Sequence, residues 1–437
     1  MTHPFIMQKP KIALEVLFRC AVERAHPINT IREHLPNPPS GKTVVVGAGK
    51  AAASMALALD KFWPQDAPLS GAVVTRYGHI PAEASARAGR IAIHEAAHPV
   101  PDESSVAAAQ IMLDLVKDLS ASDLVICLMS GGASALLALP IDGVSLAEKQ
   151  EITRQLLLSG APIDEMNVVR QSLSKIKGGQ LANACGDAPV LTLAISDVPG
   201  DRAEIIGSGP TIPFVTPEGG AAAILDRRRI VLPAGVRQAM VTWEEICRAR
   251  VPRNFSRDNV RLIATPSQSL LAAAELAKTW GINAYVLSDC IEGESKDVAK
   301  FHAEIARAVR AGKSTMQAPC VILSGGETAV TVSDSLPGLG RGGRAGEFCM
   351  GLAKALDGVS EVWALAADTD GVDGCEINAG AFVSPDTLRR AMSRGLSIED
   401  FLLRHDSFGF FDSLDDLLIT GPTHTNVNDF RALLITE

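Results

Sequence analysis

The sequence predicts an α/β protein composed of two α/β domains with mainly parallel sheets. Apolar segments of strand length alternate with segments of helical periodicity through both halves of the chain, and this alternation is typical of parallel sheets covered by helices. A chain of 437 residues exceeds what one hydrophobic core usually supports, so we expect two domains. The pattern weakens around 235–258, which places the domains at 1–240 and 241–437.

The first half shows strands and helices in alternation. An amphipathic helix is expected over 11–25, and a second helix after the turn that follows residue 46. A third helix is expected from Asp102 as N-cap, and two more within 145–184. Strands are expected at 43–46, 71–76, 90–96, 124–129 and 190–195. A polar segment rich in glycine and proline from Gly207 is too long for a plain connector, and loops of that kind are often functional.

The second half begins a new alternation at Arg261. We expect strands at 262–265, 284–289, 319–327, 329–332 and 362–368, with helices over 267–280, 295–311 and 347–356. In sheets of this kind ligands bind outside the carboxyl ends of the strands. Nearly every unusual motif of the chain lies at such an end.

Composition limits the partners and the location of the protein. The net charge is −9 without a basic tract, which disfavours nucleic acid. No apolar segment approaches the roughly 20 residues that a bilayer span needs, and the eight cysteines show no CxxC spacing, as expected for reduced thiols. We therefore expect a cytoplasmic protein with a small-molecule substrate and without a membrane partner; a homo-oligomer remains open.

Glycine turns after apolar strands are the strongest functional signal. Glycine lets the backbone approach a ligand closely, and free N–H groups at a helix start favour an anion. One such turn is also common where packing alone needs glycine, but three favour an enzyme that handles phosphate. The candidate binding residues in these turns are Gly47 and Gly49, then Ser130, Gly131, Gly132 and Ser134, and finally Ser324, Gly325 and Gly326.

Three cations lie in glycine-rich surroundings. Lys50 follows Gly49 near a helix start, where the helix dipole disfavours a cation, so a functional role is favoured over a surface lysine. Arg341 and Arg344 lie in a loop with five glycines and suit a clamp on phosphoryl oxygens, although an arginine paired with Glu347 is the structural alternative. The turn at Lys50 is not a Walker A motif, because it lacks the four-residue interval between glycines and the Ser or Thr after the lysine. It is also not a complete dinucleotide fingerprint, because Ala52 replaces the third glycine.

Carboxylates gather at the ends of three predicted strands. Mg²⁺ binds through one or two carboxylates together with substrate phosphates, and such a group of acids would repel one another unless a cation lay between them. Each aspartate alone is more often an N-cap or turn residue. The candidates are Asp197 and Asp201, Glu327, and Asp368, Asp370 and Asp373.

Together these motifs resemble the glycerate 2-kinase family, the class II glycerate kinases whose C-terminal half is called the MOFRL domain. The resemblance runs from about residue 44 to residue 430. Its motifs, in order, are VVVGAGKAA, HPVPDESS, LMSGGASALL, MNVVRQSLSKIKGGQLA, AISDVPGD, GSGPT, LSGGETAV, GRGGRAGE, DTDGVDG and TGPTHTNVNDF.

The resemblance implies ATP-dependent phosphorylation of D-glycerate at its 2-hydroxyl, with Mg²⁺. It also implies a Rossmann-like N-terminal domain, a MOFRL-type C-terminal domain and an active site in the cleft between them. The family's functional lysine falls on Lys50 and its arginine on Arg344. In this interpretation Asp197 is catalytic, Asp201, Glu327 and Asp370 are metal candidates, and the roles of Asp197 and Asp201 are interchangeable. Further binding residues are Lys177, Ser208 and Gly209.

Two departures and three alternatives accompany the resemblance. Ala345 and Gly346 stand where the family usually has Asn and Gln, and His424 stands where glycine is expected. Family members are often called hydroxypyruvate reductases, so an NAD(P)H-dependent reductase is the first alternative, although the dinucleotide fingerprint is incomplete. A kinase of a related small hydroxyacid is the second. A non-enzymatic sensor of sugar acids would bind ligand without turnover.

Overall fold

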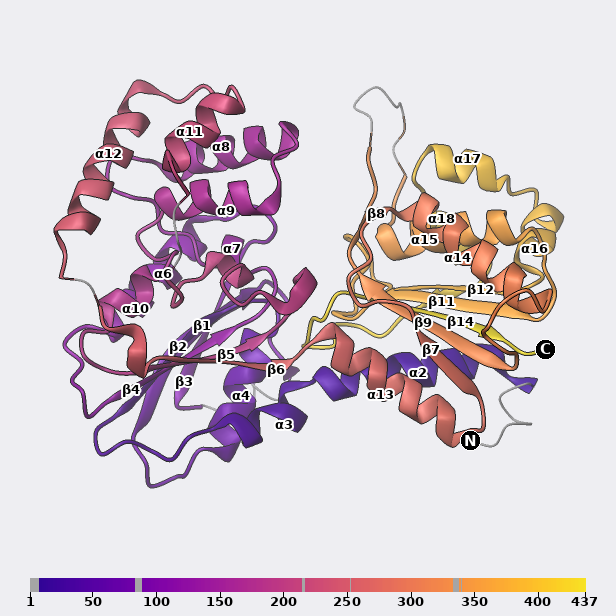
Figure 1. Ribbon diagram of the computed structural model, residues 1–437, viewed down its shortest axis with the longest axis horizontal. Helices are drawn as coiled ribbons and strands as arrows, with labels where there is room; N and C mark the ends of the chain where they lie inside the picture. Colours follow the sequence, from indigo (N-terminus) through magenta and orange to yellow (C-terminus); the bar gives the residue numbers. More distant parts are fainter. Residues whose placement is uncertain (1–7, 83–88, 214–216, 252, 333–337, 339) are drawn as a thin grey trace. The chain divides into compact units, whose positions relative to one another are not determined.

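The computed structural model describes residues 8–82, 89–213, 217–251, 253–332, 338 and 340–437 (Figure 1). The chain separates into two compact units. We call Pro27–Ser196 with Asp201–Ile263 the first-sheet unit, and Met1–His26 with Asp197–Gly200 and Ala264–Glu437 the second-sheet unit. Among the helices of the described residues, none combines the length and apolar character needed to cross a bilayer.

The first-sheet unit contains a six-stranded sheet with the order β3-β2-β1-β4-β5-β6. The pairings β3–β2, β2–β1, β1–β4 and β4–β5 are parallel. This is the Rossmann strand order, and it reverses direction between β1 and β4. The strands are β1 (Thr43–Ala48), β2 (Leu69–Arg76), β3 (Ile91–Ala96), β4 (Leu124–Met129), β5 (Val190–Ile195) and β6 (Asn259–Ala264).

Helices of this unit pack on the sheet and form a further layer beyond it (Figure 1). The helices near the strands are α3 (Pro27–Thr30), α4 (Ala52–Phe62), α6 (Glu103–Leu115), α7 (Ala133–Leu136) and α10 (Gln180–Ala184). Four helices share a separate apolar core that includes Ile152, Val169, Ile224 and Val236. They are α8 (Leu146–Leu158), α9 (Ile163–Ser172), α11 (Gly220–Arg227) and α12 (Ala234–Ala249).

The second-sheet unit contains a six-stranded sheet with the order β13-β12-β11-β14-β9-β7. Its strands are β7 (Asn283–Val286), β9 (Cys320–Gly326), β11 (Val362–Asp368), β12 (Gly380–Val383), β13 (Leu417–Leu418) and β14 (Asp429–Ile435). The two-residue strands β8 (Gly293–Glu294) and β10 (Thr328–Ala329) pair with each other.

Helices cover both faces of this second sheet (Figure 1). On one face lie α2 (Pro10–Ala25) and α13 (Pro266–Thr279). On the other lie α14 (Ser295–Arg310), α15 (Arg344–Leu356), α16 (Thr387–Ser393), α17 (Ile398–Leu403) and α18 (Ser407–Asp412).

The structure confirms the α/β class, with most pairings parallel, but corrects the expectation for the second half. There β7 and β9 are parallel, whereas β14 is antiparallel to both β9 and β11, and β12 is antiparallel to β11 and β13. The strand β14, which the sequence analysis did not predict, forms two of these antiparallel pairings. It inserts between β9 and β11, and all seven of its residues are buried.

The division into units also differs from the predicted domain ranges. The segment around 235–258 is not a crossing, because α12 occupies most of it and the first-sheet unit continues to Ile263. The N-terminal helix α2 belongs to the second-sheet unit. Its buried Leu14, Leu17 and Phe18 join the core formed with α13 and the second sheet. Burial of these apolar side chains stabilises α2 in the second-sheet unit.

Candidate active site

The turn after β1 lies against the turn after β4 in the first-sheet unit. Both strands end at the same edge, with Ala48 opposite Met129. The Ala51 N–H donates to the Ser130 hydroxyl oxygen at 3.0 Å, and the Lys50 N–H donates to the Gly131 carbonyl at 2.9 Å. The predicted turns at Gly47–Lys50 and Ser130–Gly132 therefore meet at the point where the strand order reverses, which is where such sheets bind ligands.

Gly132 brings a third group to this edge. Its φ of 82° lies in the left-handed region, and a Cβ there would lie 3.0 Å from the His98 ring and 3.4 Å from Cγ of Lys50. A side chain at position 132 would therefore press on both residues. Gly47 has a different reason to be glycine, because a Cβ there would lie 2.2 Å from the Leu128 carbonyl oxygen inside the sheet.

His98 is uncharged in this position. Burial and, after it, the charges of Lys50, Arg76 and His79 together lower its pKa to about 3. The imidazole beside Lys50 is thus neutral at ordinary pH and adds no second positive charge there. The structure places His98 beside Gly132 and Lys50.

The serine-rich loop around Ser208 lies on the same edge. Ser134 and Ser208 share a hydrogen bond between their hydroxyls at 2.7 Å, and Ser208 donates to Asn167 Oδ1 at 2.9 Å. The Gly179 N–H donates to the Gly209 carbonyl at 2.8 Å. The structure therefore brings together Ser134, Ser208 and Gly209, as expected for one site. Asn167 was missed because a single amide on a helix carries no sequence signal.

Lys177 contacts the same loop. Its side chain is buried, and Nζ donates to the carbonyls of Leu137 at 2.9 Å and Gly207 at 3.4 Å. Burial holds its pKa well below the usual range, and the neighbouring charges of Lys149 and Arg170 act in the same direction. The amine therefore ties the strand–helix turn to the Ser208 loop.

The second Ser-Gly-Gly segment does not form the predicted turn. Ser324, Gly325 and Gly326 lie inside β9, which continues through them. The Gly325 N–H donates to the Ser288 carbonyl at 2.8 Å, and a Cβ on Gly326 would lie 2.2 Å from the Ile291 nitrogen. The glycines therefore allow a close approach of the backbone at 288–291, and the Gly325 amide proposed for phosphate already has a protein acceptor.

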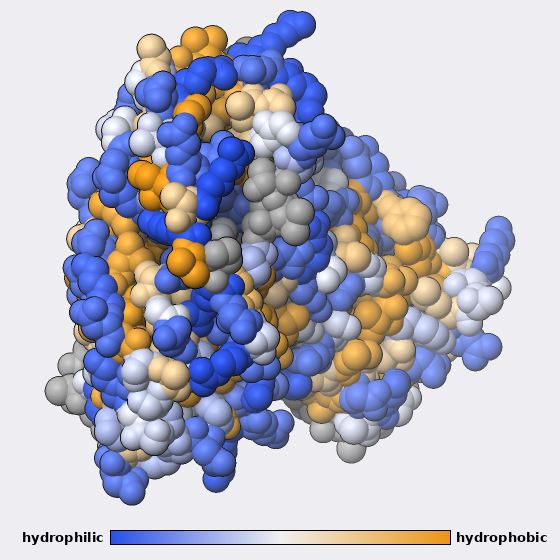
Figure 2. Space-filling view, turned by 60° about the vertical axis from the view of Figure 1, so that its left-hand side comes forward, coloured by the Kyte–Doolittle hydropathy of each residue, from blue (hydrophilic) through white to orange (hydrophobic). Residues whose placement is uncertain are grey.

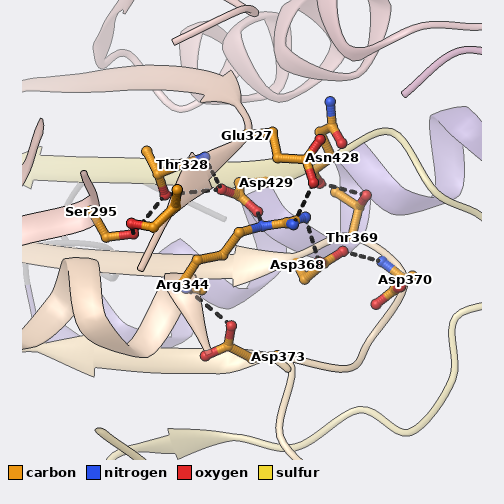
Figure 3. A network of polar contacts seen from close by, with 12 residues as sticks. Ser295, Glu327, Thr328, Arg344, Asp368, Thr369, Asp370, Asp373, Asn428 and Asp429 are labelled. Atoms are coloured by element: carbon orange, nitrogen blue, oxygen red, sulfur yellow. Dashed lines mark hydrogen bonds and ion pairs between the residues drawn. The ribbon is translucent and has the colours of Figure 1, made fainter. Parts of the chain in front are cut away.

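Arg344 is the centre of an ion-pair network in the second-sheet unit (Figure 3). Nε contacts Asp429 at 2.6 Å, Nη1 contacts Glu327 at 2.7 Å and Nη2 contacts Asp368 at 2.8 Å. Burial alone would lower its pKa, but the charges of these three carboxylates raise it well above the ordinary value. The guanidinium of Arg344 therefore lies among the clustered acids, and the structural alternative, a pair with Glu347, is absent from the described contacts of Arg344.

Asp429 and Arg431, on β14, extend the network. Arg431 is fully buried, and its Nη2 contacts Asp429 at 2.5 Å while Nη1 donates to the Gly325 carbonyl at 3.0 Å. Asp373 accepts the N–H groups of Ala345 at 3.0 Å and Gly346 at 2.8 Å at the start of α15. Burial raises the pKa of Asp373 to about 7, against the effect of these two backbone hydrogen bonds.

Three more predicted residues lie in the second-sheet unit. Asp370 accepts the Val372 N–H at 2.9 Å in a turn, which is the structural alternative considered for single aspartates. Arg341 lies 3.6 Å from Glu376 and stacks over the Phe408 ring, so it is held at the surface. Asp197 accepts the side-chain amide of Asn426 at 3.1 Å in the second-sheet unit.

The four metal and hydroxyl candidates are divided between the two compact units. Asp201 belongs to the first-sheet unit, whereas Asp197, Glu327 and Asp370 belong to the second-sheet unit. Among the described residues there is no group of three or more histidine, cysteine, aspartate or glutamate side chains placed to hold a metal ion. Glu327 is the most accessible of the network carboxylates, with half of its side chain exposed.

Comparison with known proteins agrees with this architecture. Two family models match the chain: a domain of unknown function, DUF4147, over residues 13–241, and the MOFRL family over residues 320–429. The chain is 35% identical over 425 residues to the D-glycerate 2-kinase of Thermotoga maritima, covering 97% of this chain and 98% of that protein. It is 47% identical over 422 residues to an Agrobacterium vitis protein provisionally named hydroxypyruvate reductase, covering 97% and 94%.

A solved structure shares the fold over nearly the whole chain. The crystal structure of the Thermotoga maritima glycerate kinase superimposes with a TM-score of 0.84 at 34% identity and covers 98% of this chain and 99% of that one. The fold and the glycine turns define an α/β protein whose candidate ligand-binding edge lies at the switch point of a Rossmann-type sheet. The chain belongs to the glycerate 2-kinase family, as its motifs indicated.

Proposed function

We propose that this protein transfers the γ-phosphoryl group of ATP to the 2-hydroxyl of D-glycerate. The observation that carries the proposal is the meeting of Lys50, the Ser130–Gly132 turn and neutral His98 at the switch point of the first sheet. Membership of a family that includes a D-glycerate 2-kinase supports the substrate and the reaction.

The roles of the first-sheet residues follow from their chemistry. Phosphoryl transfer depends on positioning and on neutralising charge more than on covalent catalysis. Lys50 supplies a positive charge for the substrate carboxylate or for the transferred group, and neutral His98 leaves that charge as the local cation beside Gly132. Ser134 and Ser208, hydrogen-bonded to each other at 2.7 Å, fix the Ser208 loop at the same edge.

Arg344 acts in this proposal as a positioning residue. Each of its three side-chain nitrogens donates to a carboxylate, that of Asp429, Glu327 or Asp368, so we assign it to fixing these carboxylates rather than to clamping a phosphate. The network holds three carboxylates against the two guanidiniums of Arg344 and Arg431. This excess of negative charge suits a divalent cation.

Mg²⁺ is the cation that the family resemblance implies. Glu327 fits a ligand role because its carboxylate is half exposed while one oxygen is held by Arg344. Asp370 fits poorly, because it is buried and its carboxylate closes a turn. When bound with nucleotide, Mg²⁺ neutralises phosphate charge. Asp197, whose carboxylate Asn426 orients, is the candidate that orients the substrate hydroxyl.

A reductase is the competing function, since the Agrobacterium relative bears that provisional name. One experiment separates the two. Purified protein is assayed for ADP release with Mg-ATP and a panel of three- and four-carbon hydroxyacids, and in parallel for NADH and NADPH oxidation with hydroxypyruvate without ATP. We expect ADP release that requires D-glycerate and no nicotinamide oxidation. Nicotinamide oxidation without any ADP release would overturn the kinase assignment.

A further inference from the structure

A large cavity lies at the opposite edge of the first sheet from Lys50. Its volume is about 1130 Å³, and residues just before β4 and β5, Ala121 and Pro189 among them, line its floor. The C-terminal half of α12 lines the other side together with Val251, Arg253, Asn254 and Arg257. Lys50 and Ser130 follow the carboxyl ends of six-residue strands, which are about 20 Å long, so the cavity is separate from the proposed catalytic edge.

The lining of this cavity is basic although the whole chain carries a net charge of −9. Two carboxylates, Asp142 and Asp187, face it. Against them stand five basic side chains, namely Lys175, Arg248, Arg250, Arg253 and Arg257. A cavity that gathers cations on an acidic protein attracts anions, because field lines concentrate in concave, low-dielectric surroundings.

Ion pairs neutralise three of these cations but leave two. Lys175 pairs with Asp142, Arg248 with Glu244 at 2.5 Å, and Arg253 with Asp258 at 2.8 Å. In contrast, the hydrogen bonds of Arg250 and Arg257 within the described structure go to neutral oxygens. Arg250 donates to Gln180 Oε1 at 2.8 Å, and Arg257 donates to the Ala121 carbonyl at 3.3 Å.

Arg250 is also held in place by an aromatic ring. Its guanidinium lies 5.0 Å from the centroid of Trp243, which lines the same cavity. A guanidinium has five N–H donors, and one hydrogen bond leaves most of them for a ligand. Arginine in this state recognises phosphate through paired N–H donors. Figure 2, which brings forward the side of Figure 1 that carries α12, shows hydrophilic and apolar residues side by side on that face.

We propose that this cavity binds a phosphorylated anion, with its phosphates on Arg250 and Arg257 and any organic part against Trp243. The volume exceeds the roughly 300–1,000 Å³ of typical ligand pockets, so a molecule of nucleoside diphosphate size fits. The site is separate from the proposed catalytic edge, because Ala121 and Pro189 in its lining precede β4 and β5, whereas Ser130 follows β4.

Trp243 provides a readout that belongs to this cavity. Inorganic pyrophosphate and, separately, ADP are titrated into the full-length protein while tryptophan fluorescence is recorded, and the signal of Trp243 is identified by subtracting the Trp243→Phe variant. We expect a saturable Trp243-dependent change with at least one probe. Tighter binding of ADP assigns the ring to the organic part, and equal binding assigns the site to phosphate alone.

Charge-removing variants complete the test. Losing hydrogen bonds to charged groups costs about 1.5–3 kcal/mol each, so the Arg250→Gln/Arg257→Gln double variant should raise the Kd at least about tenfold. Arg154→Gln, which removes an exposed arginine of α8, should leave the Kd unchanged, and ADP release with D-glycerate should persist in both. The absence of a Trp243-dependent change with both probes, or an unchanged Kd in the double variant, would overturn the proposal.

Discussion

Lys50 follows β1 directly and lies beside Gly132, whose Cβ would meet both its side chain and the His98 ring. If its ammonium neutralises charge at the reacting centre, Lys50→Ala should lower turnover by about 10²–10³-fold and leave the unfolding midpoint unchanged. Lys61→Ala, at an exposed position in the last turn of α4, is the matched control. Steady-state ADP release measures both, and full activity of Lys50→Ala would remove the residue from the mechanism.

Arg344 holds Asp368 and Asp429, whose side chains are only 6% and 1% exposed. Removing the guanidinium leaves these charges without one of their partners, and breaking a buried pair costs about 3–5 kcal/mol. Arg344→Gln should therefore lower the free energy of unfolding by a few kcal/mol. Arg341→Gln is the control, because that side chain is exposed and such pairs contribute about 0–1 kcal/mol. Equal unfolding midpoints for the two variants would contradict the network's stabilising role.

Asp373 makes stability depend on pH. Its pKa of about 7 in the folded protein lies above the ordinary value of 3.8, so the folded state keeps a proton that the unfolded state has lost. Its contribution to stability is therefore greatest below pH 4 and declines as pH rises to about 7. We expect the free-energy difference between wild type and Asp373→Asn to change across that window. A difference that stays constant from pH 4 to 8 would refute the raised pKa.

The sequence identified some of these residues and not others for a physical reason. Lys50, Ser130, Gly131 and Gly132 follow apolar strands directly, so glycine and strand pattern reveal them. Asp429 and Arg431 lie on β14, far along the chain from Glu327 and Arg344. Only the antiparallel pairing of β14 with β9 and β11 brings them into the network.

At the scale of elements, substitutions in α2 test whether this helix packs on the second sheet. Phe18 is 1% exposed and packs edge-on against Phe430 of β14, with ring centroids 5.8 Å apart. Phe18→Ala should lower the stability of the second-sheet unit by about 3–5 kcal/mol. Ile12→Ala, on the exposed side of the same helix, should change it by no more than about 0.5 kcal/mol. Calorimetry that follows the unfolding of the two units measures this, and similar effects of both variants would argue against the packing.

Element type was easier to predict than element direction. A buried strand is a continuous apolar run whether its neighbours are parallel or antiparallel, so β9, β11 and β7 were expected but their orientations were not. The helix α12 was missed because only Val236 among its residues is fully buried, so its sequence is a mixture of polar and apolar residues. The Ser324–Gly326 segment resembled a turn, although close backbone packing explains its glycines equally well.

At the scale of the whole molecule, the proposed function depends on two groups of residues that belong to different compact units. The first-sheet unit supplies Lys50 and the glycine turns, and the second-sheet unit supplies the Arg344 network and Asp197. The expectation of one active site in a cleft between the domains remains a prediction. The proposal requires that both groups serve one phosphoryl transfer.

The product of that transfer tests the central claim most directly. Purified protein is incubated with Mg-ATP and D-glycerate, and the phosphoester is examined by ³¹P NMR with proton coupling. Phosphate on the 2-hydroxyl is attached to a carbon with one hydrogen and gives a doublet, whereas phosphate on the 3-hydroxyl is attached to a CH₂ group and gives a triplet. The account predicts the doublet, and a triplet or the absence of any phosphoester would contradict it.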